Sequence, residues 1–175
     1  MASVFDQLKI LIVDDEAHTR TLIKEVLQII GFNQANIREA SDGLSAFKSL
    51  EEEKVHIIIS DWRMEPMDGL TFVRKLRDQA TSPDPFVPVI FCSAHTDQEM
   101  IERARDMGVN EVIAKPVSIG NVESRILAVL EQPRPFVAAT QYFGPDRRRR
   151  RDGPIDGKDR RQKKRVHIKT VRDET

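Results

Sequence analysis

Four short apolar runs divide the first 130 residues of the chain. They cover residues 8–13, 55–59, 87–92 and 112–114. Runs with so little polar alternation are typical of strands that are buried on both faces, as in parallel sheets. A shorter and more mixed stretch, residues 36–40, predicts one further strand.

Segments with helical spacing separate these runs. In residues 17–30 the apolar side chains Leu22, Val26 and Ile30 recur every four residues, and Gly31 follows as a stop signal. The same spacing predicts four more amphipathic helices, the last of which has Ser118 as its N-cap. They lie within residues 43–50, 70–76, 100–107 and 122–130.

The predicted strands and helices alternate five times. A strand that returns to a parallel neighbour through a helix crosses over with one handedness, so the helices pack on both faces of one sheet. We therefore expect residues 5–131 to form a doubly wound, flavodoxin-like (βα)5 domain of the α/β class, with a five-stranded parallel sheet.

The last 43 residues have a different composition. Residues 133–175 hold 14 basic and 6 acidic residues, a formal charge of +8, so residues 1–132 carry −8 and the whole chain is neutral. Pro and Gly interrupt this segment, and its only hydrophobic cluster is residues 136–139 with Tyr142 and Phe143. We predict that residues 132–175 form a flexible basic tail, because so few apolar residues cannot offset the entropy of ordering it.

The rest of the composition favours a reduced, cytoplasmic compartment. The single cysteine, Cys92, cannot form an internal disulfide and is expected in the core. The first residues, MASVFDQLK, lack the features of a secretory signal. No apolar run approaches the ~20 residues that a membrane helix needs, so we expect no membrane insertion.

Polar side chains follow four of the predicted strands at the point where each strand ends. Ligands of open α/β sheets bind beyond the carboxyl ends of the strands, so these residues should meet at one edge. They are Asp14 and Asp15 after the first strand, Asp61 after the third, Ser93 after the fourth and Lys115 after the fifth.

Three neighbouring carboxylates repel one another unless cations lie among them. Lys115 offsets one charge, and Mg²⁺ would offset the rest, because it binds one or two carboxylates together with phosphate oxygens. In such a site Asp61 could attack a phosphoryl group while Mg²⁺ and Lys115 neutralise the equatorial oxygens and Ser93 donates a hydrogen bond to one of them.

Four motifs in order carry a resemblance to a known family. They are LIVDDE (residues 11–16), SDWRMEPMDG (60–69), FCSA (91–94) and AKP (114–116). Together they closely resemble the receiver domain of bacterial response regulators, the CheY-like family, over residues 5–131. The resemblance implies a two-component regulator in the cytoplasm that is not an enzyme, apart from hydrolysis of its own phosphoryl group.

The resemblance also implies roles for single residues. Asp61 matches the phosphoacceptor, which receives its phosphoryl group from a sensor histidine kinase or a histidine phosphotransfer protein. Asp14 and Asp15, together with Asp61 and the backbone carbonyl of Arg63, match the ligands of Mg²⁺. The residues that match the phosphate-binding and switch positions are Ser93, Ala94 and Lys115.

The chain departs from the family pattern at one position. Val112 stands where the family usually has a Tyr or Phe that changes rotamer on activation. Arg63 and His95 occupy the two positions that tune self-dephosphorylation in the family, and bulky or cationic groups there could hinder the attacking water.

We expect output to come through binding, since the sequence predicts no catalytic domain after the receiver. The resemblance points to a downstream protein partner on the face made by residues 97–130, and association into a homodimer stays open. The basic stretches from Arg147 to Arg151 and from Arg160 to Arg165 could bind nucleic acid, another polyanion or an acidic protein, or could be no more than a solvated charge run.

Three alternatives are also compatible with the sequence. Asp14 and Asp15 could be a polar turn that opens a helix. The chain could be a phosphatase of the haloacid dehalogenase type, although that resemblance asks for Asp-x-Asp after the first strand. It could also be an adaptor in which the basic tail binds a polyanion and the receiver only regulates it.

Overall fold

A computed structural model describes residues 4–139, residues 141–147 and the backbone of residues 164–166. Its centre is a five-stranded parallel sheet with the strand order β2-β1-β3-β4-β5. This order is that of the doubly wound, flavodoxin-like fold, which confirms the predicted fold class. The strands are β1 (Ile10–Val13), β2 (Ile37–Ala40), β3 (Ile57–Asp61), β4 (Val89–Ser93) and β5 (Glu111–Ala114).

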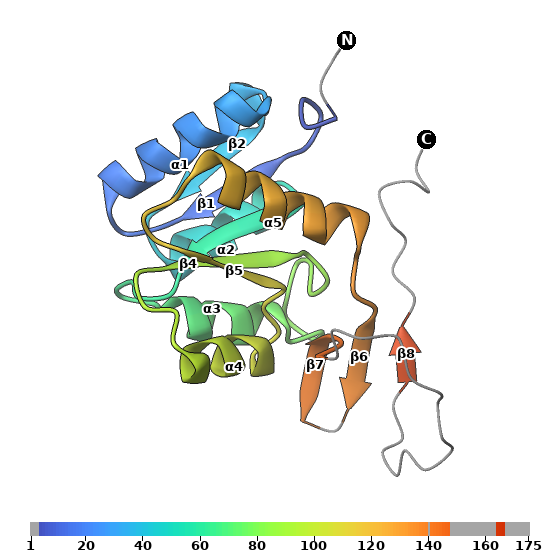
Figure 1. Ribbon diagram of the computed structural model, residues 1–175. Helices are drawn as coiled ribbons and strands as arrows, with labels where there is room; N and C mark the ends of the chain where they lie inside the picture. The colour runs from blue at the N-terminus through green and yellow to red at the C-terminus, as the bar shows by residue number, and fades with distance from the viewer. Residues whose placement is uncertain (1–3, 140, 148–163, 167–175) are drawn as a thin grey trace.

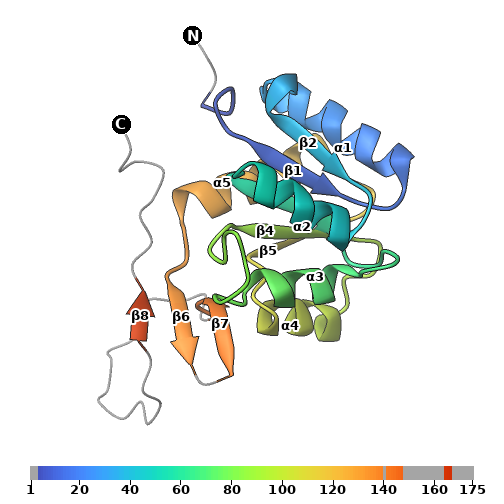
Figure 2. The ribbon, with the colours of Figure 1, turned by 180° about the vertical axis from the view of Figure 1, so that it is seen from behind.

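Five α-helices cover the sheet. Figures 1 and 2 show α1 and α5 on one face and α2, α3 and α4 on the other. The helices are α1 (Ala17–Ile30), α2 (Gly43–Glu52), α3 (Gly69–Leu76), α4 (Gln98–Asp106) and α5 (Ile119–Glu131), with a short 3-10 turn η1 (Gln34–Asn36) before β2.

The core consists of two hydrophobic clusters, one on each face of the sheet. Strands β1 and β4 are buried along their whole length, and β3 is buried up to Asp61, as the uninterrupted apolar runs predict. Because helices cover both faces of the sheet, strand residues reach the surface at the ends of the strands. This places the polar residues of the carboxyl ends at one edge.

Local signals in the sequence set the helix boundaries. Gly31 ends α1 in the left-handed conformation with φ 114°, and the Ser118 side chain caps α5 by accepting from the backbone N–H of Asn121. Not every residue on the predicted apolar faces is buried, since Leu22 and Leu44 are 38% and 52% exposed.

The prediction of an unordered tail from residue 132 is wrong for its first part. Strands β6 (Phe136–Ala139) and β7 (Tyr142–Pro145) form an antiparallel hairpin, and β8 (Lys164–Val166) pairs with the other side of β6. Phe136 and Val137 are 1% and 5% exposed. The hairpin is ordered because it packs on the body of the chain (Figure 1), where Phe136 contacts Phe86 and Arg77. Most of the two predicted basic stretches lies outside the described residues.

Candidate functional site

The first two carboxylates of the site belong to Asp14 and Asp15, which directly follow β1. Asp14 is only 1% exposed, whereas its neighbour Asp15 is exposed. The Asp14 side chain accepts a hydrogen bond from the backbone N–H of Glu16 at 2.9 Å, and the guanidinium of Arg20 donates to the Asp14 carbonyl at 2.7 Å. These contacts hold the Asp14 side chain in the interior. The turn after β1, which could have been only a polar helix start, therefore contains a buried carboxylate.

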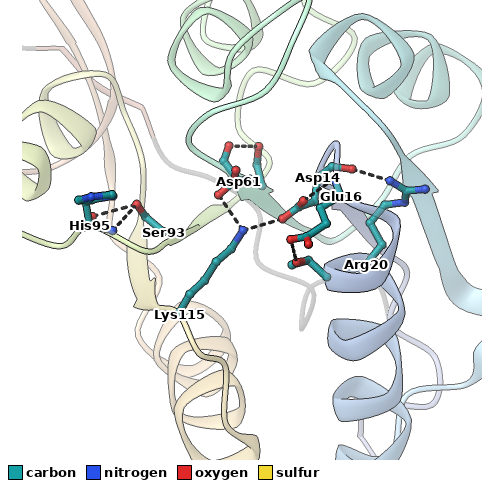
Figure 3. A network of polar contacts seen from close by, with 9 residues as sticks. Asp14, Glu16, Arg20, Asp61, Ser93, His95 and Lys115 are labelled. Atoms are coloured by element: carbon teal, nitrogen blue, oxygen red, sulfur yellow. Dashed lines mark hydrogen bonds and ion pairs between the residues drawn. The ribbon is translucent and has the colours of Figure 1, made fainter.

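Asp61 and Lys115 meet Asp14 at this edge. Asp61 ends β3, and its side chain is 13% exposed. Lys115 follows β5 and directs its ammonium between two carboxylates, 2.9 Å from Asp14 Oδ2 and 3.1 Å from Asp61 Oδ1 (Figure 3). Three strands therefore place these groups together, although they lie far apart in the sequence.

Burial and charge act in opposite directions on the two partners. Burial raises the pKa of Asp61, and this outweighs the opposing charge and hydrogen bond of Lys115. Burial alone would lower the pKa of Lys115, but its hydrogen bond to Asp14 and the charge of Asp61 outweigh burial, so this pKa is raised. The ammonium stays charged, while Asp61 is held in surroundings that favour an additional cation.

A metal ion fits this set of groups. Oxygen atoms of Asp14, Asp15 and Asp61 all lie within 4.8 Å of one another. Carboxylate oxygens are the ligands of hard divalent cations such as Mg²⁺, which keeps several of its waters in a shallow site. One lysine cannot balance three carboxylates, so the uncompensated charge also favours a cation here. Arg63, whose carbonyl is a further predicted ligand, is exposed in the loop after β3.

Ser93 lies at the same edge, at the end of β4, and is 5% exposed. Its hydroxyl donates to the carbonyl of His95 at 2.9 Å and accepts from the N–H of His95 at 3.2 Å (Figure 3). Ala94 and His95 are exposed. To donate to a phosphoryl oxygen on Asp61, the Ser93 hydroxyl would have to give up the hydrogen bond that it donates within its own loop.

Gly69 holds the loop after β3 against Asp61, a role that was not predicted from the sequence. Its N–H donates to the carbonyl of Trp62 at 3.0 Å, and a Cβ atom on it would lie 2.2 Å from the carbonyl oxygen of Asp61. Only glycine permits this approach. The signal was present in the sequence as Asp68 followed by Gly69, since Asp68 caps α3 by accepting from the Thr71 N–H.

Val112 leaves open space where a larger side chain could lie. It is half-buried in β5 and lines a groove of about 230 Å³ between α4, β5 and α5, together with Ile101, Ala104 and Arg125. The aromatic ring next to the site is instead Trp62, which packs edge-on against Phe91 with 5.5 Å between the ring centroids. The guanidinium of Arg103, on α4, lies 5.8 Å from the Trp62 ring centroid.

Comparisons with known proteins agree with this geometry. The chain matches the family model of the response regulator receiver domain over residues 10–127. It is 35% identical over 127 residues to the probable chemotaxis protein CheY of Rhizobium etli, a match that covers 73% of this chain and 95% of that protein.

Solved structures of similar fold extend the comparison. Chemotaxis protein CheY4 of Vibrio cholerae has a TM-score of 0.63 and 27% sequence identity, over 70% of this chain and 98% of that one. The receiver domain of the sensor histidine kinase PA1611 from Pseudomonas aeruginosa has a TM-score of 0.59 and 29% identity, over 69% and 94%, and holds a magnesium ion coordinated in its active site cleft.

The family match ends at residue 127, before the hairpin β6–β7 begins. Within the part of the chain that the structure describes, no helix combines the length and the apolar character needed to cross a membrane.

Proposed function

The chain belongs to the response regulator receiver family, and we propose that Asp61 is the residue on which this two-component regulator accepts a phosphoryl group. The observation that carries the proposal is the Lys115 ammonium between Asp14 and Asp61, with Asp15 beside them. The family assignment decides against a haloacid dehalogenase phosphatase, and no comparison favours a polyanion-binding adaptor.

The proposed transfer uses the Asp61 carboxylate as nucleophile. One of its oxygens attacks the phosphorus of a phosphohistidine on a sensor histidine kinase or phosphotransfer protein, a P–O bond forms, and the P–N bond to the histidine breaks. Bound Mg²⁺, held by Asp14, Asp15, Asp61 and the Arg63 carbonyl, would supply positive charge to the phosphoryl oxygens. Lys115 already lies 3.1 Å from Asp61 and would pair with another of these oxygens.

Phosphorylation would then draw the Ser93 hydroxyl away from His95 and toward Asp61. Ser93 ends β4, and α4 begins only five residues later at Gln98, so this movement shifts the start of α4. The surface affected is the face of residues 97–130, where the groove beside Val112 is open. We propose this face as the site for a downstream protein partner.

The proposal extends to the lifetime of the phosphoryl group, through two exposed side chains. Arg63 and His95 follow Asp61 and Ser93 by two residues each, and both are exposed at the rim of the site. Water that hydrolyses the phosphoaspartate must approach past them. We propose that they slow self-dephosphorylation by occupying this path.

Phosphorylation with a small donor tests the central assignment. The protein is incubated with acetyl phosphate and Mg²⁺, and its intact mass is measured. We expect one added phosphoryl group on the wild type and none on Asp61→Asn. Asp68→Asn is the matched control, because asparagine still caps α3 and the residue lies outside the carboxylate cluster.

The outcomes separate cleanly. Labelling of Asp61→Asn at the wild-type level would show that the phosphoryl group lies elsewhere. A wild type that labels equally well with excess EDTA would refute the role of the three carboxylates in holding Mg²⁺. The Asp68→Asn control should label like the wild type in both media.

A further inference from the structure

The hairpin β6–β7 packs against the edge of the sheet opposite the carboxylates. Its rings Phe136 and Phe143 form a cluster with Phe86, which lies in the loop between α3 and β4, with 5.2 to 5.5 Å between the ring centroids. Figures 1 and 2 both show the hairpin beside the C-terminal end of α4. The aromatic cluster therefore fixes the hairpin to the body at the point where the chain enters β4.

Arg77 connects this cluster to the end of α4. Its guanidinium is buried and lies over the ring of Phe136, 5.0 Å from the ring centroid. It donates to the carbonyl oxygens of Pro85, Val87 and Gly108 at 2.8 to 3.1 Å. Gly108 is the turn residue after α4, with φ 94°, and a Cβ atom there would lie 3.1 Å from Arg77 atoms. The turn after α4 is thus held from inside by Arg77.

The hairpin holds the same turn from outside. A Cβ atom on Gly144 would lie 3.0 Å from the Cα of Gly108, so the two backbones are in direct contact. Arg147 forms an ion pair with Asp106, the last residue of α4, at 2.8 Å, and lies 4.0 Å over the ring of Tyr142. The Tyr142 hydroxyl donates to the carbonyl of Pro145 at 2.7 Å, which keeps this ring in place.

The other end of α4 is tied to the phosphorylation site. Helix α4 starts at Gln98, directly after the loop in which Ser93 bonds to His95. Arg103, in the last turn of α4, lies over Trp62, so this turn of the helix also lies beside the residue that follows Asp61. Helix α4 thus spans the distance between the reacting carboxylate and the hairpin. Any displacement of α4 as a rigid body must strain or break the contacts at its C-terminal end.

We propose that the hairpin β6–β7 is a clamp on the C-terminal end of α4 that opposes the movement of this helix when Asp61 is phosphorylated. The inference rests on the proposed function, since it assumes that Asp61 is the acceptor. The contacts of Gly144 and Arg147 stabilise the position of α4 in which they form. A group that binds at Asp61 and favours a different position of α4 must break them, so they lower its affinity. Weakening the clamp should therefore strengthen binding at Asp61.

The test uses the full chain with Mg²⁺ and beryllofluoride, a phosphoryl analogue that binds carboxylates. Binding is followed by the fluorescence of Trp62, the only tryptophan. Arg147→Gln removes the ion pair with Asp106. Gly144→Ala adds a Cβ atom 2.8 Å from the Tyr142 hydroxyl and 3.0 Å from the Gly108 Cα, so the Tyr142 ring and the contact with Gly108 must both shift. Arg38→Gln is the control, because Arg38 lies on β2, the edge strand farthest from β5. The substitution removes ion pairs with Glu52 and Glu53 and a hydrogen bond to the Ser49 carbonyl.

We expect the dissociation constant of beryllofluoride to fall about threefold in Arg147→Gln, the scale of an exposed ion pair, and further in Gly144→Ala. Arg38→Gln should match the wild type. Equal or weaker binding by Arg147→Gln would overturn the clamp, even if Gly144→Ala fails to fold. A wild type that binds no better than Asp61→Asn would instead overturn the proposed function.

Discussion

Replacing Phe136 with alanine should destabilise the whole chain, even though the residue lies beyond the matched family domain. The side chain is 1% exposed, its ring lies 5.3 and 5.5 Å from the rings of Phe86 and Phe143, and it covers the guanidinium of Arg77 at 5.0 Å. Truncation of a buried phenylalanine costs about 3–5 kcal/mol. The loss of a desolvated cation–π contact contributes about 0.5–2 kcal/mol of this.

We therefore expect Phe136→Ala to lower the free energy of unfolding by about 4 kcal/mol, a large share of the roughly 5–15 kcal/mol that domains possess. For a chain of this size the midpoint of thermal unfolding should fall by about 8–16 °C. Urea unfolding followed by circular dichroism measures the change. Ile29→Ala, on the exposed surface of α1 at 66% exposure, serves as the control and should stay within about 0.5 kcal/mol.

The result that would refute this reasoning is a small change. If Phe136→Ala costs less than about 1 kcal/mol, the ring does not contribute a buried contact and residues 136–145 do not belong to the folded body. A second measurement guards against a local effect, because deleting the hairpin should also reduce the slope of the free energy with urea concentration, in proportion to the surface no longer buried.

Three further predictions concern the site. Because burial raises the pKa of Asp61 above the 3.8 of a free aspartate, its ionisation destabilises the metal-free fold as pH rises from 3.8 through the raised pKa. Asp61→Asn should thus be more stable than the wild type in EDTA at pH 7, with the gap closing toward pH 3.8, and urea titrations that show a less stable variant would contradict this. Gly69→Ala, whose Cβ would lie 2.2 Å from the Asp61 carbonyl oxygen, should slow phosphorylation by acetyl phosphate about 100-fold, whereas an unchanged mass-spectrometric time course would exclude a positioning role. Cys92 is 1% exposed, and burial raises the pKa of its thiol to about 12. A thiol reagent at pH 8 should therefore react with Cys92 only after unfolding, and rapid labelling of the native protein would disprove its burial.

Local patterns were enough to predict the body of the fold. The apolar runs ending at Val13, Ile59 and Cys92 are long enough to identify strands. Apolar residues at every fourth position of α1 identify a helix that packs on them. The hairpin was missed because its partners, Phe86 and Arg77, are distant in sequence and lie in a loop and at a helix end. Its own signal was present, since two apolar segments flank Thr140 and Gln141 at the spacing of a hairpin turn.

The site was predictable to a similar depth. The rule that functional residues follow strand ends brings Asp14, Asp61 and Lys115 together. In the structure the Lys115 ammonium lies 2.9 Å from Asp14 and 3.1 Å from Asp61. The orientation of the Ser93 hydroxyl was not predictable, because it depends on the conformation of the loop that carries His95. The same holds for Arg20, whose bond to the Asp14 carbonyl depends on the direction in which α1 leaves β1.

The two edges of the sheet stabilise charges of opposite sign. At the amino edge Arg77 is buried with a pKa lowered to about 10, yet its hydrogen bonds among the described residues all go to neutral oxygens, and a ring covers its face. At the carboxyl edge one lysine faces three carboxylates, and the pKa of Asp61 is raised. The amino edge is complete without a ligand and contributes stability, whereas the carboxyl edge is stabilised only when cations arrive. Because α4 joins the two edges, charge added at Asp61 can act on the hairpin, and the strength of the hairpin contacts sets how far α4 responds.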